Sequence, residues 1–317
     1  MPTQIGENRA KKMLKANELV LCMGVNQLRT PNIAMIAAAC GFDAVYIDLE
    51  HNPTSLETAA GVCVAALGMG ITPIARVTSH DPHDATRILD CGAQGVMVPH
   101  VQNAGEARAI VETCLYAPKG HRSAFGSGPQ LGYAAIPQAE VCKVLNEQTL
   151  LMAMIETPDA VENADAIAAV DGIDVLHIGA SDLSTEMGIP GQYTHERMRA
   201  AFESVARAAK NHDKAMGVGG VRQDFEFQSW LLRLGVRYLT GGSDVGYILS
   251  AGRGDMKYQP ISLRPNNERL HGPPLDVQPA RCAHAMKRSR AEQRGDRARV
   301  LEVRIHSPPA GSLAPAY

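Results

Sequence analysis

An eightfold alternation of short apolar runs with helical segments constrains the fold of this chain more than any other feature. Each run is rich in aliphatic or β-branched residues, as buried strands are, and segments with helical periodicity separate the runs. The runs are Val20–Val25, Val45–Glu50, Pro73–Arg76, Gly95–Pro99, Leu151–Glu156, Leu176–Asp182, Met216–Val218 and Tyr238–Gly242. Strands that alternate with helices indicate a parallel sheet, and eight such units in 317 residues fit a closed barrel. We therefore predict an α/β protein with a (β/α)₈ TIM barrel.

The other common parallel architecture is an open, doubly wound sheet, and its dinucleotide-binding motif is missing here. The glycines at 126–128 and 217–220 lack the G-x-G-x-x-G spacing that cradles a pyrophosphate. Beyond Asp255 the alternation stops, and from Arg264 the chain is rich in Pro, Arg and Gly. We divide the chain into a barrel domain, residues 1–263, and a C-terminal extension, residues 264–317. The extension is expected to be flexible, or to form a helix over 281–303 that needs a partner.

Composition excludes several classes of protein. The chain has no stretch of about 18 apolar residues, and residues 1–19 lack the apolar core of a signal peptide, so we expect a soluble, cytoplasmic protein. The seven cysteines are scattered and never spaced C-x-x-C, which argues against disulfides and zinc sites. A formal net charge of −2 gives no overall attraction to nucleic acid. We expect neither nucleic acid nor a membrane as a partner.

Polar side chains stand at the C-terminal ends of four predicted strands. They are Asp48, Glu50 and His51 after the second strand, Arg76 at the third, Glu156 at the fifth and Asp182 at the sixth. In a parallel barrel all strand ends of one kind share one face, and enzymes with this fold build their active sites there. A single acid at a strand end is more often a helix cap than a ligand. Four polar strand ends on one face favour a common site instead.

The residue types in this set suit metal-assisted chemistry on a 2-oxo acid. Glu156 and Asp182 offer hard oxygen ligands of the kind that Mg²⁺ or Mn²⁺ prefers, with water and substrate oxygens completing the coordination. Such an ion would act as a Lewis acid on the enolate that forms when a carbon–carbon bond beside the carbonyl breaks. Arg76 is suited to donate to the same oxygen. His51, three residues after Asp48, is the candidate base, and we expect the Asp48 carboxylate to orient its imidazole and stabilise the cation.

Other features have a more ordinary interpretation. The turn at 179–182 could offer backbone N–H groups to a carboxylate. His177 lies within a strand, so we expect it to pack or hydrogen-bond inside the barrel rather than act in catalysis. The glycine-rich segment 116–137 interrupts the alternation, and a loop of that length is usually an active-site lid or an error in the assignment of elements.

Taken together, these residues resemble the HpcH/HpaI aldolase family of class II, metal-dependent pyruvate aldolases, over residues 5–256. The matching motifs are Asp48-Leu49-Glu50-His51, Ala75-Arg76, Val98-Pro99, Gly120-His121-Arg122, Ile155-Glu156-Thr157 and Gly179-Ala180-Ser181-Asp182-Leu183. The resemblance implies an aldehyde-lyase that reversibly cleaves a 4-hydroxy-2-oxo acid to pyruvate and an aldehyde, in the breakdown of aromatic or sugar acids. It also implies a (β/α)₈ barrel whose last helix can swap between neighbours in a hexamer built from dimers.

The same resemblance assigns roles to individual residues. It implies that Glu156 and Asp182 hold a divalent ion (Mg²⁺, Mn²⁺ or Co²⁺), and that Arg76 binds and stabilises the pyruvate enolate. His51 with Asp48 would move the proton of the hydroxyl group through water. The carboxylate of the substrate would be held around Gly179, Ser181 and Asp182.

The sequence departs from the common pattern of this family in three places. Ala180 replaces the usual proline, Ser123 replaces a second glycine after the loop arginine, and His100 replaces an apolar residue. The first change adds a backbone donor and should matter little. The other two we place at the entrance of the site, where they would affect the choice of aldehyde.

Three alternatives remain open. A Schiff-base aldolase would need a lysine near a strand's C-terminal end, and none of the nine lysines is placed there. An acyl-CoA lyase of the citrate lyase β-subunit or malyl-CoA lyase type would need an extended basic surface, which the barrel portion lacks. A non-enzymatic binding protein could use the arginine-rich extension to recruit an acidic partner.

Overall fold

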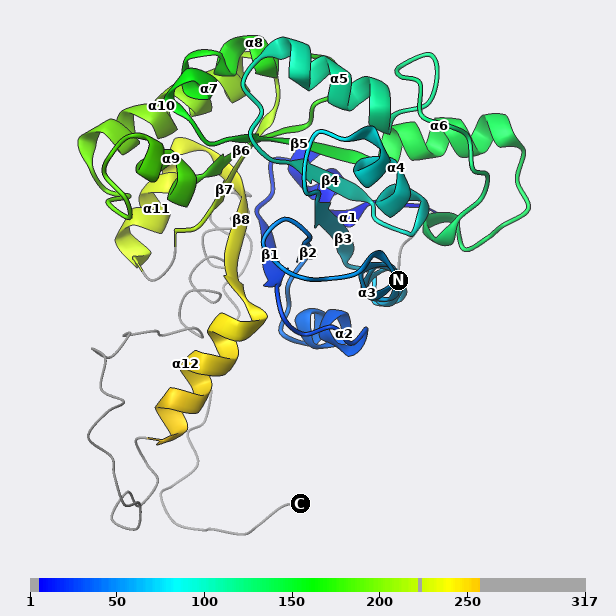
Figure 1. Cartoon of the computed structure of the whole chain (residues 1–317), viewed down its shortest axis with the longest axis horizontal. Coiled ribbons are helices and arrows are strands. Elements are labelled where there is room, and N and C mark those ends of the chain that lie inside the picture. Colours follow the sequence, from blue (N-terminus) through cyan, green and yellow to red (C-terminus); the bar gives the residue numbers. More distant parts are fainter. Residues whose placement is uncertain (1–5, 222–223, 257–317) are drawn as a thin grey trace, which may run out of the picture. The chain divides into compact units, whose positions relative to one another are not determined.

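The computed structural model describes residues 6–221 and 224–256, and in this part of the chain eight parallel strands close into a barrel. Each strand pairs with the next, and β8 returns to pair with β1 (Figure 1). The strands are β1 (Val20–Val25), β2 (Ala44–Asp48), β3 (Thr72–Arg76), β4 (Gly95–Val98), β5 (Leu150–Ile155), β6 (Val175–Gly179), β7 (Ala215–Gly219) and β8 (Val236–Ser243). The predicted (β/α)₈ barrel is confirmed.

Helices connect the strands on the outside of the barrel. They are α1 (Arg9–Lys15), α2 (Asn32–Ala39), α3 (Leu56–Gly68), α4 (Pro82–Asp90), α5 (Ala104–Cys114), α6 (Gln138–Gln148), α7 (Pro158–Glu162), α8 (Ala164–Ala168), α9 (Ala180–Glu186), α10 (Glu196–Asn211), α11 (Phe225–Leu234) and α12 (Asp244–Met256), with a 3₁₀ turn, η1 (Pro129–Leu131). The pattern predicts one helix over 159–169, but the structure has two, α7 and α8. They meet at Asn163, whose side chain donates to the Gln102 carbonyl (2.9 Å).

The barrel interior is an apolar core formed by inward-pointing residues of the strands. Its members include Val20, Ala44, Ile74, Met97, Leu150, Met152, Val175 and Tyr238, each fully buried. Alternate residues of a strand point to opposite faces, so in β2 and β3 the inward series that holds Ala44 and Ile74 carries on to the last residues, Asp48 and Arg76. Position along the strand therefore decides which polar side chains reach the mouth of the barrel.

Helix α1 closes the N-terminal end of the barrel with a polar network. The Asn8 side chain donates to the Gln94 and Gln148 carbonyls (2.9 and 2.8 Å) and accepts from the backbone N–H of Lys11 (3.0 Å). The Lys11 ammonium donates to the Thr149 carbonyl (2.5 Å) and pairs with Asp174 (2.9 Å). Burial lowers the pKa of Lys11, although Asp174 opposes the shift. This buried lysine lies at the wrong end of the barrel to form a Schiff base with a substrate at the mouth.

Segment 116–137 is not a lid over the mouth. It links the C-terminus of α5 to α6, which precedes β5, and connections from helix to strand lie at the N-terminal end of a barrel. Its contacts agree: Arg122 pairs with Asp90 at the end of α4 (2.6 Å), and Gln130 donates to the Ala93 carbonyl just before β4 (2.9 Å). The expectation that Ser123 borders the entrance was therefore wrong, because its segment packs at the opposite end.

The C-terminal part of the described chain ends in α12, which contacts β8 and β1 (Figure 1). The Asp244 carboxylate, at the start of α12, accepts the backbone N–H groups of Asn26, Gln27 and Leu28, so it fixes this junction to the loop after β1. No described helix is long and apolar enough to cross a membrane. The predicted extension, 264–317, and the possible helix over 281–303 lie outside the described residues.

Candidate active site at the carboxyl ends of the strands

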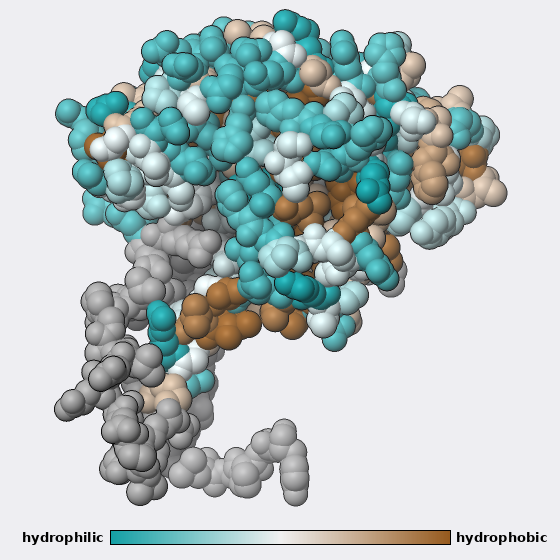
Figure 2. All heavy atoms as spheres, in the orientation of Figure 1, coloured by the Kyte–Doolittle hydropathy of each residue, from teal (hydrophilic) through white to brown (hydrophobic). Residues whose placement is uncertain are grey.

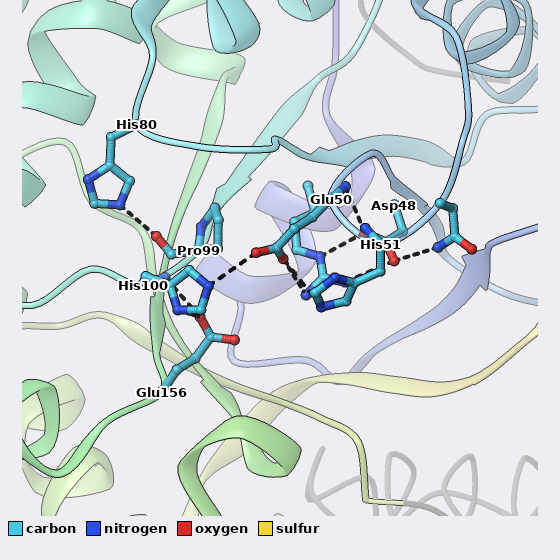
Figure 3. Close-up of polar contacts among 9 residues, drawn as sticks. Asp48, Glu50, His51, His80, Pro99, His100 and Glu156 are labelled. Carbon is cyan, nitrogen blue, oxygen red and sulfur yellow. Dashed lines mark hydrogen bonds and ion pairs between the residues drawn. The ribbon is translucent and has the colours of Figure 1, made fainter. Parts of the chain in front are cut away.

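The polar strand ends predicted from the sequence meet at the C-terminal mouth of the barrel, where Figure 3 shows Asp48, Glu50, His51 and Glu156. Asp48 and Arg76 are the last residues of β2 and β3 and stand opposite each other in the parallel register. Glu156 directly follows β5, and Asp182 lies in the first turn of α9, three residues after β6. Barrel closure thus brings four distant segments of the sequence to one place.

Arg76 lies at the centre of the contacts in this site. Its guanidinium donates through Nε to Asp48 Oδ1 (2.9 Å), pairs through Nη2 with Asp48 Oδ2 (2.8 Å), and pairs through Nη1 with Glu50 Oε2 (2.9 Å). The residue is only 7% exposed, and the group also lies over the Tyr46 ring, 5.6 Å from its centre. Three contacts to a planar group fix its orientation.

These contacts also fix the charges of the pair. Burial opposes the charge on Asp48, but the hydrogen bond and the charge of Arg76 outweigh it and hold the pKa of Asp48 below its usual value. For Arg76, burial likewise opposes the charged form, and Asp48 reverses the effect, so that the pKa of Arg76 is raised. The site therefore keeps a fixed cation at its centre at neutral pH.

Glu156 is the most buried acid of the site, at 1% exposure. One oxygen, Oε2, accepts the backbone N–H of His100 (2.8 Å) and lies 3.3 Å from its Nδ1. The other, Oε1, has no hydrogen-bond partner among the described residues. A Cβ atom at position 179 would stand 2.5 Å from Oε1, so the glycine there is needed to make room for this carboxylate.

The charge on Glu156 is poorly compensated. Burial raises its pKa, His100 opposes that shift, and the nearby acids Asp182 and Glu50 add to it. The described residues contain no group of three or more His, Cys, Asp and Glu side chains placed to bind a metal. A buried, unpartnered carboxylate oxygen within electrostatic reach of a second carboxylate nevertheless fits a divalent cation that takes its other ligands from water and substrate. Glu156 and Asp182 are the residues that would hold it.

The turn after β6 carries the predicted substrate-binding residues. Gly179 ends β6, and Ser181 and Asp182 lie in the first turn of α9. Ser181 is exposed, and its hydroxyl lies 3.4 Å from the Tyr193 hydroxyl. Asp182 is half-buried. The turn thus borders the mouth next to Glu156, and its role in binding a carboxylate stays a prediction.

His51 lies at the rim, but its imidazole does not meet the Asp48 carboxylate as the sequence suggested. Both oxygens of Asp48 are engaged by Arg76, and Oδ2 also accepts from Asn52 Nδ2 (2.7 Å). The backbone N–H of His51 approaches Asp48 Oδ1 at 3.4 Å, while its Nε2 lies 3.7 Å from Glu50 Oε2. The role of His51 as a base stays a prediction, with Glu50 as its nearest carboxylate.

Two residues gain importance from the structure that they lacked in the sequence. Glu50 links Arg76, His51 and His100, since its Oε1 lies 3.1 Å from His100 Nε2. His100 spans the space between Glu50 and Glu156. The sequence signal for Glu50 was its position at a polar strand end, and the signal for His100 was that it replaces the apolar residue usual in the family. Neither signal indicates which residues these side chains contact.

His177 lies in the barrel core below this site. It is fully buried on β6, its ring packs edge-on against Tyr238 (centroids 5.5 Å apart), and glycines 217 and 219 of β7 leave the space for it. Burial and the charge of Arg76 lower its pKa to about 3, so it is neutral at physiological pH. The placement agrees with the expectation of a packed histidine.

Comparison with known proteins gives a consistent set of similarities. Residues 25–251 match the family model described as HpcH/HpaI aldolase/citrate lyase. The chain is 39% identical to the 4-hydroxy-4-methyl-2-oxoglutarate aldolase of Hapsidospora irregularis over 230 residues, 71% of this chain and 84% of the relative. It is 37% identical to the enzyme of the same description from Chaetomium globosum, over 74% of this chain and 89% of the relative.

A solved structure shows the same similarity in three dimensions. The HpcH/HpaI aldolase from Desulfitobacterium hafniense superposes with a TM-score of 0.75 at 30% sequence identity, covering 81% of this chain and 97% of that one.

Proposed function

Because this chain belongs to the HpcH/HpaI aldolase/citrate lyase family and is a carbon–carbon lyase of the aldolase class, we propose that it is a metal-dependent class II aldolase. The reaction is the reversible cleavage of a 4-hydroxy-2-oxo acid to pyruvate and an aldehyde or other carbonyl compound. The observation that carries the proposal is the buried, unpartnered Glu156 Oε1 at the same mouth as the fixed guanidinium of Arg76.

Arg76 provides the positive charge that the reaction needs. Breaking the C3–C4 bond leaves its electron pair on the pyruvate half, where negative charge gathers on the 2-oxo oxygen as an enolate. Arg76 is held by Asp48 and Glu50 and cannot turn away, so its N–H groups are ready for that charge without reorganisation. Glu156 and Asp182 would hold a divalent ion, which would act as a Lewis acid and stabilise the enolate charge further.

The proton of the C4 hydroxyl group must leave as the C3–C4 bond breaks. His51 is the candidate acceptor, through water, because its ring is exposed at the rim and has an ordinary partner for an imidazolium in Glu50. The hydroxyl-bearing carbon becomes the carbonyl of the released partner. A proton then returns to C3 of the enolate to give pyruvate.

The test is turnover by metal-stripped protein before and after addition of Mg²⁺, Mn²⁺ or Co²⁺. Substrates would include 4-hydroxy-4-methyl-2-oxoglutarate and 4-hydroxy-2-oxovalerate, since these appear in the descriptions of relatives. We expect pyruvate release that depends on metal, and a metal-induced rise in Tm that Glu156→Gln abolishes. Full activity without metal, trapping of pyruvate by borohydride, or turnover of an acyl-CoA substrate alone would contradict the proposal.

We further propose that the chain assembles into a homo-oligomer, with the hexamer implied by the family resemblance as the expected size. The supporting observation is apolar side chains exposed on two elements: Met35 and Ile36 on α2, and Ile248 and Leu249 on α12. Apolar side chains gather over this part of the surface in Figure 2. Light scattering on the wild type and on Ile248→Lys tests the idea, and a monomeric wild type would reject it.

A further inference from the structure

His100 is held at the mouth by an unusual backbone conformation. Its φ of +55° is in the left-handed region, which a histidine adopts at some cost. The conformation lets the backbone N–H of His100 donate to Glu156 Oε2 while the imidazole faces Glu50 (Figure 3). The preceding residue is fixed as well, because the Pro99 carbonyl contacts His80 Nε2 at 2.6 Å. The ring position is therefore built into the loop after β4.

The imidazole of His100 is nevertheless available to a ligand. Its side chain is 55% exposed, whereas those of Glu50 and Glu156 are 11% and 1% exposed. The ring edge thus touches the site, and the rest of the ring faces solvent. A substrate group at Nε2 would have to replace only the contact with Glu50, because the backbone N–H of His100 keeps its bond to Glu156 Oε2.

The contacts of His100 show which chemistry the ring is placed for. Both ring nitrogens lie near carboxylate oxygens, Nε2 at 3.1 Å from Glu50 Oε1 and Nδ1 at 3.3 Å from Glu156 Oε2. Across Glu50 lies the second exposed imidazole, His51, with Nε2 at 3.7 Å from Oε2. Two imidazoles from neighbouring loops therefore flank the carboxylate of Glu50 at the rim. Ring N–H groups placed in this way can donate to the oxygens of a carboxylate.

The position of His100 assigns it to one half of the substrate. In the proposed reaction the pyruvate half lies with Arg76, Glu156 and the turn after β6. The half released as a carbonyl compound must then extend from C4 towards the rim, where the loops after β2 and β4 carry His51 and His100. A carboxylate on that half would reach His100 and take the place of the Glu50 carboxylate beside its ring.

We propose that His100 is a specificity residue that binds a carboxylate on the acceptor half, so that the preferred substrate is a 4-hydroxy-2-oxo dicarboxylate. The inference rests on the proposed aldolase function. It assigns the released partner to the class of oxo acids rather than simple aldehydes. His100 takes no part in the bond-breaking step and acts only through this contact.

The experiment compares two acceptors in aldol addition with pyruvate: glyoxylate, which carries a carboxylate, and acetaldehyde, which does not. The variants are His100→Met, which removes the donor, and His100→Asn, which keeps a donor and tolerates the left-handed backbone. His83→Met is the matched control, because His83 is an exposed histidine on the neighbouring helix α4. Intrinsic differences in reactivity cancel when the ratio of the two acceptors is compared between proteins.

We expect His100→Met to lower kcat/KM for glyoxylate by about 10-fold or more, mainly through KM, and to leave the value for acetaldehyde nearly unchanged. His100→Asn should recover part of the loss, and His83→Met should match the wild type. An equal loss with both acceptors, or no loss with either, would overturn the inference. Exchange of the pyruvate methyl protons with D₂O tests the aldolase function separately from the role of His100. A wild type that catalyses exchange but shows no acceptor preference contradicts only the role of His100. A wild type that catalyses neither exchange nor addition contradicts the aldolase function.

Discussion

Asn8 and Lys11 at the N-terminal end of the barrel and Glu156 at the C-terminal end are buried polar side chains that are paired to different extents. At the N-terminal end, the fully buried Asn8 has partners on both its amide and its carbonyl, and the Lys11 ammonium has two. At the C-terminal end, Glu156 is buried as deeply, yet Oε1 has no partner among the described residues. Unpaired buried polar groups are costly, so they persist where something other than folding requires them. Segment 116–137 at the N-terminal end also holds buried atoms without a partner, Tyr116 Oη and Arg122 Nε, but Glu156 Oε1 belongs to a carboxylate, so the contrast supports the proposal of a cation site at the mouth.

The largest effect should come from removing the unpaired charge itself. Glu156→Gln is expected to lower turnover roughly 10³-fold, because the group that would hold the cation is lost. The metal-free variant should be at least as stable as the wild type, since a poorly compensated buried charge has gone. Steady-state kinetics and thermal unfolding check both parts. A variant that keeps activity would show that Glu156 is not needed for turnover, and one that loses several degrees of Tm would show that Glu156 serves the fold.

Replacing the fixed cation should have the next largest effect. Arg76→Lys keeps the charge but cannot contact both Asp48 oxygens and Glu50 at once, so kcat should fall roughly 100-fold. For Arg76→Lys we expect kcat to fall by a larger factor than KM rises, relative to the wild type. A steady-state assay with saturating metal measures the two constants separately. Activity within a few-fold of the wild type would mean that the bidentate geometry is unimportant.

The corresponding test at the N-terminal end of the barrel is Asn8→Ala, which removes a fully paired side chain. It takes one donor from the Gln94 carbonyl, which keeps the backbone N–H of Leu150, and one from the Gln148 carbonyl. It also removes the cap of α1, so the free energy of unfolding should fall by about 2 kcal/mol. The kcat measured below the unfolding temperature should match the wild type. Chemical denaturation gives the first quantity. A loss of kcat without a loss of stability would break the assignment of the two ends.

The smallest expected effect concerns His177, one layer below the mouth. Its pKa falls to about 3 in the folded chain because burial, and then Arg76, disfavour the charged form. The unfolded chain binds a proton below about pH 6.5, so this group takes stability away as the pH falls from about 6.5 towards 3. Between pH 7 and 5.5 the loss is about 1 kcal/mol.

His177→Gln has no such titration, and its stability should depend less steeply on pH over that range. Denaturant unfolding at several pH values measures the slope, and the wild type serves as the control. An unchanged slope would mean that another group dominates the acid lability.

The outline of the fold could be predicted because it depends on local patterns. A buried strand is an apolar run, a helix is an amphipathic or Ala-rich one, and glycine or proline marks where each ends. The exceptions show the limits. The helix predicted over 159–169 is interrupted at Asn163, whose side chain bonds to the loop that follows β4. Segment 116–137 could be a lid or an error in the assignment of elements, because the sequence does not say at which end of the barrel a loop lies.

The candidate site could likewise be predicted from the sequence only in part. The residues at the mouth could be listed from the sequence, because alternation along each strand and a shared direction bring the polar strand ends to one face. The contacts that these side chains make with one another could not be predicted from the sequence. The sequence favoured a contact between Asp48 and His51, three residues apart, but Arg76 from the next strand takes both Asp48 oxygens.

By itself, then, the sequence determined the barrel and the polar character of its mouth, since periodicity and strand ends are properties of short segments. The tertiary structure alone decided that Glu156 shares one oxygen with the backbone of His100, 56 residues away, and keeps the other unpaired. Contacts over such separations depend on how the barrel closes and on the exact path of each loop. A left-handed residue such as His100 changes that path without leaving any periodic trace in the sequence.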